Sequence, residues 1–145
     1  MAVAFTNNWK NILDKLESII ETEFKGALPV YKASDIPKGV NQAIQITPIG
    51  SELIEYNVTG EMREYTISVL FVFNEINVNE TALDHILRQV SRIEALIHDN
   101  TSTTLADDSN LFNCRFESTE LNSDEESGIY VVTWDYKCQH LGNVG

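Results

Sequence analysis

The 145-residue chain holds few of the residues that usually mark specialised sites: two cysteines, three prolines and seven glycines. Cys114 and Cys138 are too few for a disulfide framework, and their spacing matches no zinc motif. We therefore interpret both as reduced thiols packed in a core. No apolar run approaches the ~20 residues of a membrane helix, and residues 1–10 lack the pattern of a signal peptide. We expect no membrane association, and assembly in a cytosol.

Basic residues are also scarce, and their distribution is uneven. Ten Lys and Arg stand against 22 Asp and Glu, which gives a formal net charge of −12. Residues 1–40 are balanced, with five of each sign, whereas residues 41–145 hold five basic and 17 acidic residues. Such a surface repels the phosphate backbone, so specific nucleic-acid binding is excluded. An RNA-binding sheet would need basic residues around its aromatic side chains.

The usual motifs of catalysis are missing from the sequence. It contains no Gly-rich phosphate loop, no HExxH and no GxSxG. His85, His98 and His140 form no i, i+4 pair, and we interpret them as surface or helix-end residues. The many carboxylates are interpreted as a solvated acidic face, because acid–base pairs need a desolvated pocket. We therefore predict that the protein is not an enzyme and has no catalytic residues, no cofactor and no metal.

Two segments show the three- and four-residue spacing of amphipathic helices. The first is expected at residues 7–25, capped by one of the polar residues at positions 6–8 and ended by Gly26 and Pro29. The second is expected to begin at Asn79 or Thr81 and to end near residue 99. Its predicted core stripe is Leu83, Ile86, Leu87, Val90, Ile93 and Ile97.

The region between the helices alternates as β-strands do. Residues 26–42 show no hydrophobic period and are expected to form a long loop. Loops of this length in compact domains are usually functional or mobile. Strands are predicted at residues 43–47, 53–58 and 62–74, with a break at Pro48–Gly50. The long third strand carries Tyr65, Ile67, Val69, Phe71 and Phe73 on one face. Its other face is also fairly apolar and could meet a partner.

The last unit is predicted to be a hairpin of strands 111–121 and 129–140. Trp134 and Phe116 are expected on its buried face. Charge decides the predicted register: Arg115 is placed opposite Asp135, because the alternative places it opposite Lys137. The fold class is therefore α+β, a mostly antiparallel sheet of about five strands with two helices on one face, in the order α-β-β-β-α-β-β and in a single domain over residues 1–145.

This layout resembles the tail terminator, or tail-completion, family of long-tailed bacteriophages. The resemblance rests on the first helix, the Pro/Gly-broken loop, the long strand at residues 63–73, the single long helix and the last strand at residues 129–136. It is one of pattern and contains no signature motif. It implies a structural virion protein of the tail and neck. Such a protein forms a hexameric ring, caps the tail tube and joins it to the head connector.

The resemblance gives roles to two groups of residues. Acidic residues in or beside turns are candidates for lining a central channel through which DNA passes without being bound: Glu61, Glu64, Asp124, Glu125 and Glu126. The sheet edges are candidates for the subunit interface, together with apolar residues of the 26–42 loop and of the second face of the long strand: Val30, Tyr31, Ile36, Leu70 and Val72. The implied partners are further copies of the chain, a tail-tube protein and a head connector protein.

Two other interpretations stay open at this stage. A head–tail connector or neck ring has much the same layout and differs in its partner. A cellular ligand-binding or adaptor domain would use the apolar sheet face as a pocket and would be monomeric or dimeric. The mass of the particle in solution separates a ring from a pocket.

Overall fold

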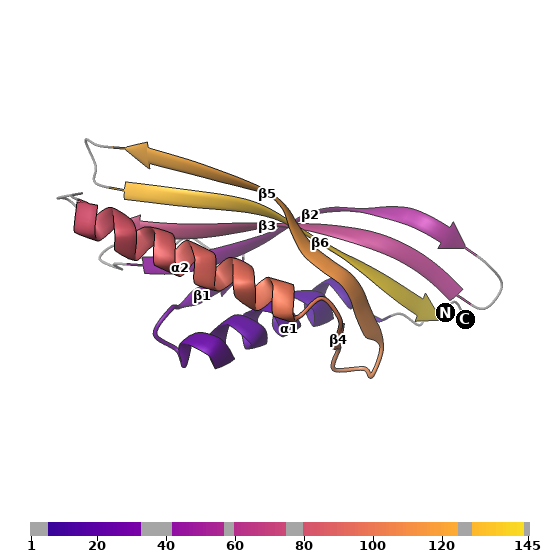
Figure 1. Ribbon diagram of the computed structural model, residues 1–145. Helices are drawn as coiled ribbons and strands as arrows, with labels where there is room; N and C mark the ends of the chain where they lie inside the picture. The colour runs from indigo at the N-terminus through magenta and orange to yellow at the C-terminus, as the bar shows by residue number, and fades with distance from the viewer. Residues whose placement is uncertain (1–5, 33–41, 57–59, 75–79, 125–128, 144–145) are drawn as a thin grey trace.

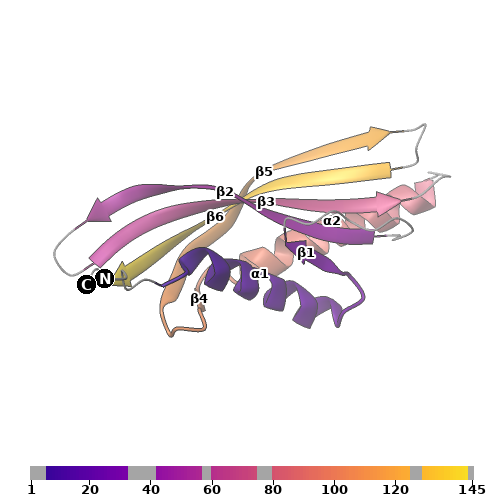
Figure 2. The same cartoon turned by 180° about the vertical axis from the view of Figure 1, so that it is seen from behind.

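The computed structural model describes residues 6–32, 42–56, 60–74, 80–124 and 129–143. Two helices pack against one twisted sheet, and Figures 1 and 2 show both of them on the same face of it. The strand order is β1-β2-β3-β6-β5-β4, and every neighbouring pair is antiparallel except β1–β2. The elements are α1 (Asn8–Phe24), β1 (Val30–Lys32), β2 (Gln42–Tyr56), β3 (Gly60–Asn74), α2 (Glu80–Asp99), β4 (Thr103–Thr104), β5 (Asn110–Asp124) and β6 (Ile129–Asn143).

This architecture confirms the α+β class and corrects the order of strands. A short strand, β1, lies within the segment that was expected to be a loop, and β4 lies in the polar segment after α2. The two strands predicted on either side of Pro48–Gly50 are one strand, β2, because the irregularity there is a bulge and the pairing with β3 continues past it. A bulge adds an unpaired residue without ending the ladder, so the sequence signal of a break was misleading.

Helix α1 forms where its periodicity places it. The side chain of Asn7 accepts a hydrogen bond from the Lys10 backbone N–H at 3.1 Å, which satisfies one free donor of the first turn. Lys25 ends the helix with a left-handed backbone, φ 52°, and Gly26 follows with φ 79°. The buried stripe is Ile12, Leu16, Ile20 and Phe24.

Helix α2 departs from its predicted core stripe. Ile86, Val90, Ile93 and Ile97 are buried as expected. Leu83 and Leu87, in contrast, are 40% and 41% exposed. They lie to one side of the buried row, so this part of the predicted stripe was wrong: the apolar surface of the helix is wider than the surface that the sheet covers.

The core lies between the helices and the inner face of the sheet. The predicted inward residues of β3 are all buried, and Trp134 of β6 is fully buried. Its ring stacks on Phe116 at a centroid distance of 4.9 Å, and its indole N–H donates to the Glu94 carboxylate at 3.2 Å. His140 is also buried and its Nε2 lies 2.9 Å from Ser109 Oγ, so the surface placement of this histidine was wrong.

The predicted register of the last hairpin is wrong as well. Arg115 pairs with Lys137, and Phe116 pairs with Tyr136. Two bulges shift β5 against β6, and a pairwise comparison of charges on two strands cannot foresee them. The like charges are tolerated because a third strand supplies a carboxylate between them, as described below. Cys114 and Cys138 are buried and free.

Candidate assembly interface

The outer margin of β2 is open over most of its length. Strand β1 pairs with β2 only up to Ile46, and no described strand pairs with this margin beyond it. We call residues 47–56 the β2 edge. Figures 1 and 2 show this part of β2, with β3 and the end of β6, projecting beyond both helices. Its large apolar side chains are exposed: Ile49, Leu53, Ile54 and Tyr56.

The opposite margin of the sheet is open in the same way. Strand β4 covers β5 only at Asn110 and Leu111, and the Cys114 N–H donates to the Thr101 carbonyl at 3.0 Å. Beyond Arg115 no described strand pairs with this side of β5. We call residues 116–124 the β5 edge. Its exposed large apolar side chain is Leu121, at 52%, whereas Phe116 is half-buried.

A stripe of α2 runs alongside the β5 edge. Glu94 lies on this stripe, and its carboxylate accepts hydrogen bonds from Thr119 of β5 at 2.8 Å and from Trp134. Leu87 precedes Glu94 by two helical turns and Leu83 lies one turn further back, so both point to the same side of the helix. The apolar side chains exposed on α2 therefore extend the apolar surface of the β5 edge.

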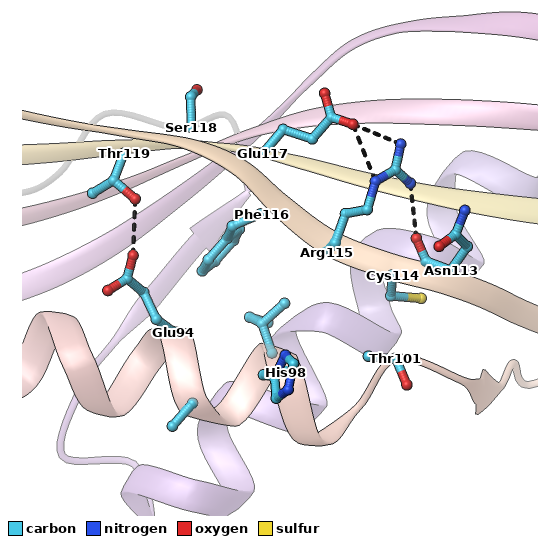
Figure 3. Close-up of a pocket in the computed structure, with 12 residues that line it drawn as sticks. Glu94, His98, Thr101, Asn113, Cys114, Arg115, Phe116, Glu117, Ser118 and Thr119 are labelled. Atoms are coloured by element: carbon cyan, nitrogen blue, oxygen red, sulfur yellow. Dashed lines mark hydrogen bonds and ion pairs between the residues drawn. The ribbon is translucent and has the colours of Figure 1, made fainter.

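A groove of about 600 Å³ separates the C-terminal half of α2 from β5. Figure 3 shows Phe116 and Cys114, which line the groove from β5, and His98, which lines it from α2. The bond from Thr119 to Glu94 spans the groove at one end, and Arg115 lies at the other, held by the carbonyl of Asn113 at 2.9 Å. The lining is mixed, with one carboxylate reaching across it, and the groove opens at the β5 edge.

Exposed apolar side chains are concentrated at these two edges. In the described part of the chain eight large apolar side chains are exposed, and all but Leu141 lie on the β2 edge, the β5 edge or the adjoining stripe of α2. Strand edges of monomeric proteins are usually protected by charges, because an unpaired edge is a template for another strand. Neither edge carries a basic residue, although both carry carboxylates: Glu52 and Glu55 on the β2 edge, and Glu117, Glu120 and Asp124 on the β5 edge. These two edges are therefore the candidate surfaces for contact with another chain.

The interface residues proposed from the sequence lie elsewhere in part. Leu70 and Val72 are half-buried on the sheet face that no described helix covers. Val30 and Tyr31 are half-buried in β1, at the margin of the sheet. Ile36 lies outside the described residues. Their role in an interface stays a prediction.

The uncovered face carries a compact ion network around Glu64. Arg115 Nη2 lies 3.2 Å from this carboxylate and 2.7 Å from Glu117, and Lys137 Nζ lies 3.9 Å and 3.5 Å from the same two groups. Gln139 also donates to Glu64 at 3.2 Å. Partial burial alone would raise the pKa of Glu64, but these hydrogen bonds and charges hold it below its usual value. The network joins β3, β5 and β6 and is electrically balanced.

The carboxylates proposed for a channel therefore differ in their surroundings. Glu64 is neutralised within the network, and Glu61 is paired with Arg63. Asp124 ends β5 with its side chain outside the described part, and Glu125 and Glu126 lie outside it altogether. Their role in a channel stays a prediction. Four other carboxylates project from the uncovered face, and no cation of the described segments lies within ion-pair distance of them: Glu52, Glu55, Glu120 and Asp135.

Sequence reasoning proposed the sheet edges in general as an adhesive surface, but it did not identify residues 47–56 as an open edge. The signal was present in the sequence: Leu53, Ile54 and Tyr56 lie within four residues of one strand, and because side chains of a strand alternate between its two faces, they cannot all lie on the same face.

In the described segments no group of three His, Cys, Asp or Glu could hold a metal ion. None of the described helices is long and apolar enough to cross a membrane.

Comparisons with known proteins give little more. No family model matches the chain, and no curated protein matches it. Among solved structures, the chain is similar to one described as "Virion of native gene transfer agent (GTA) particle", with a TM-score of 0.46 and 12% sequence identity over 88% of this chain and 84% of that one.

Proposed function

We propose that this chain is a structural virion protein that assembles with copies of itself into a closed ring, and that it acts as a phage tail terminator. The ring caps the last ring of the tail tube and joins it to the head connector. The resemblance in sequence layout suggests six copies per ring and a place at the junction of tail and neck. The protein does this work by contact and shape, without catalysis.

One observation carries this proposal: a single sheet has two open edges, and exposed apolar side chains gather on these edges and on the adjoining stripe of α2. A chain with one self-complementary interface forms twofold dimers. A chain with two different, complementary interfaces on opposite margins associates head to tail, and it closes into a ring when the rotation between neighbouring copies permits closure. The two edges lie on the outermost long strands, β2 and β5. Exposure of these side chains in a monomer would invite aggregation, and a closed ring removes every edge at once.

The uncovered sheet face suits the wall of a channel. Its centre is polar, with Thr47, Thr66, Ser68 and Thr133, and its ion network is balanced. The four carboxylates that have no ion pair with a cation of the described segments add negative charge around this centre. A wall of this kind repels the phosphate backbone and lets DNA pass without holding it.

The connector interpretation uses the same ring and differs only in its partners. Light scattering coupled to size-exclusion chromatography, across concentration and salt, tests the ring itself. The protein is measured alone and after mixing with tail-tube protein. A particle of about six copies in either sample is the expected result. A monomer that binds neither tube nor connector protein would overturn the proposal, and the groove beside α2 would then be screened for small ligands.

A further inference from the structure

The two open edges run in opposite directions within the sheet. Strand β2 is antiparallel to β3, β3 to β6, and β6 to β5. Three reversals make β5 antiparallel to β2. When a second copy in the same orientation is placed beside the first, its β2 therefore meets β5 as an antiparallel neighbour. The alternation of strand directions continues across the junction without a break.

The two edges are offset along the strand direction. The β2 edge lies level with residues 61–68 of β3. The β5 edge lies level with residues 67–74 of β3, through its pairing with β6. The offset is six residues, or about 20 Å at the usual rise per residue. Each copy must therefore slide by this distance relative to the previous one for the two edges to overlap.

This offset has a geometric consequence for a closed ring. Four strands span about 19 Å across the sheet. The displacement from one copy to the next is therefore about 19 Å across the strands and about 20 Å along them. In a closed ring this displacement must run around the circumference, which requires the strands to be inclined by about 45° to the ring axis. Strands of closed barrels are inclined by roughly 35–45°. Six such steps enclose a sheet wall with a diameter of about 50 Å, wide enough for duplex DNA.

We propose that the β5 edge of one copy pairs antiparallel with the β2 edge of the next, so that the sheets of all copies join into one continuous wall. This proposal rests on the ring assembly proposed above and specifies how it closes. With a slide of six residues Leu121 lies opposite Ser51 of the next copy, both on the helical side of the sheet. Glu120 then lies opposite Glu52 on the uncovered side.

A twofold pairing of β5 with β5 is the competing arrangement. It is also antiparallel, but it leaves both β2 edges open, and pairing those in turn produces an open chain. It also brings two copies of the most acidic edge together, with Glu117, Glu120 and Asp124 on each side. Head-to-tail pairing uses each edge once and closes.

Blocking one edge at a time tests the direction of pairing. Leu121→Lys places a charge on the β5 edge and leaves the β2 edge intact, and Leu53→Lys does the reverse. Each variant alone is expected to be monomeric where the wild-type chain is oligomeric. An equal mixture of the two is expected to form dimers and nothing larger, because each supplies the edge that the other lacks. Leu141→Lys is the matched control, since its side chain is 53% exposed, like Leu121, and lies on neither edge.

The outcomes separate this proposal from the proposed function. A ring that survives both edge variants overturns the pairing and leaves the ring intact. Monomers in the mixture also overturn it. A wild-type chain that stays monomeric both alone and after mixing with tail-tube protein overturns it too, although binding of the monomer to tube protein would still support the terminator role.

Cross-linking and charge reversal test the register. A mixture of Leu121→Cys and Ser51→Cys chains is expected to give a disulfide-linked dimer, and neither variant alone is expected to do so; the native thiols are buried. Cross-linking of Leu121→Cys with itself would establish the twofold arrangement instead. Because Glu120 faces Glu52, Glu52→Lys is expected to strengthen association, and adding Glu120→Lys is expected to cancel the gain. A strengthening in the double variant contradicts the register.

Discussion

Trp134 provides a test of the core and of the hydrogen bond that its indole N–H makes with Glu94. Its ring is fully buried and stacked on Phe116 with an interplanar angle of 9°, and its N–H is satisfied by Glu94. Replacing it with alanine removes the largest fully buried side chain and leaves a cavity, which typically costs about 3–5 kcal/mol. With a urea m value of about 2 kcal/mol/M, the unfolding midpoint should fall by about 2 M.

The hydrogen bond can be separated from the packing by a double-mutant cycle. Trp134→Phe retains much of the ring and loses the donor. Glu94→Ala leaves the indole N–H buried without its acceptor, which costs roughly 1–3 kcal/mol. The two effects should be less than additive by about 1 kcal/mol, because both remove the same contact.

The assay is urea unfolding followed by far-UV circular dichroism, which does not depend on the replaced fluorophore. Leu87→Ala is the control: its side chain is 41% exposed in the monomer, so a loss below about 1 kcal/mol is expected. A loss under 1 kcal/mol for Trp134→Ala would show that the residue is not in the core and would undo the assignment of faces. A large loss for Leu87→Ala would restore the stripe expected from the sequence.

Three further predictions concern titratable groups. Burial lowers the pKa of His140, so its contribution to stability is present above about pH 6.5 and is lost as the pH falls below that value; His140→Gln should flatten this part of the urea-midpoint profile, and an unchanged slope contradicts the assignment. Glu64→Gln leaves only Glu117 of the network to offset Arg115 and Lys137, and it should lower the free energy of unfolding by about 1 kcal/mol at pH 7, after screening by solvent. Because the pKa of Glu64 lies below its usual value of 4.5, that difference should shrink as the pH falls below 4.5. Burial raises the pKa of Cys114, and both thiols are buried, so neither should react with a thiol reagent until the protein unfolds; rapid labelling of the folded protein contradicts their burial.

Periodicity predicted the elements that pack on the core. The first helix and the inner face of the long strand follow directly from spacings of 3.6 and 2, because these side chains have one apolar environment to enter. The spacing of Leu83 and Leu87 belongs to the same period and failed. The spacing of apolar residues on a helix predicts which side chains share a face. It does not predict how far the sheet extends beneath that face.

The register of the last hairpin shows a second limit. Comparison of two strands made Arg115 opposite Lys137 look unfavourable, and the actual solution uses Glu64 of a third strand, far away in sequence. Bulges add single-residue shifts that no alternation reveals. The open edges were equally hidden, because whether a strand has a neighbour is a property of the whole sheet. Exposed apolar residues on β2 could be noticed in the sequence, but the sequence alone does not say that they are exposed.

Electron microscopy of the wild-type particle tests ring closure most directly. The sample is taken at the protein and salt concentrations where light scattering shows the largest particle, because screening weakens the repulsion between the acidic edges. Closed rings of about six copies with a central opening are the expected result. Twofold dimers, or open chains of variable length, would contradict the account that the two sheet edges close a ring.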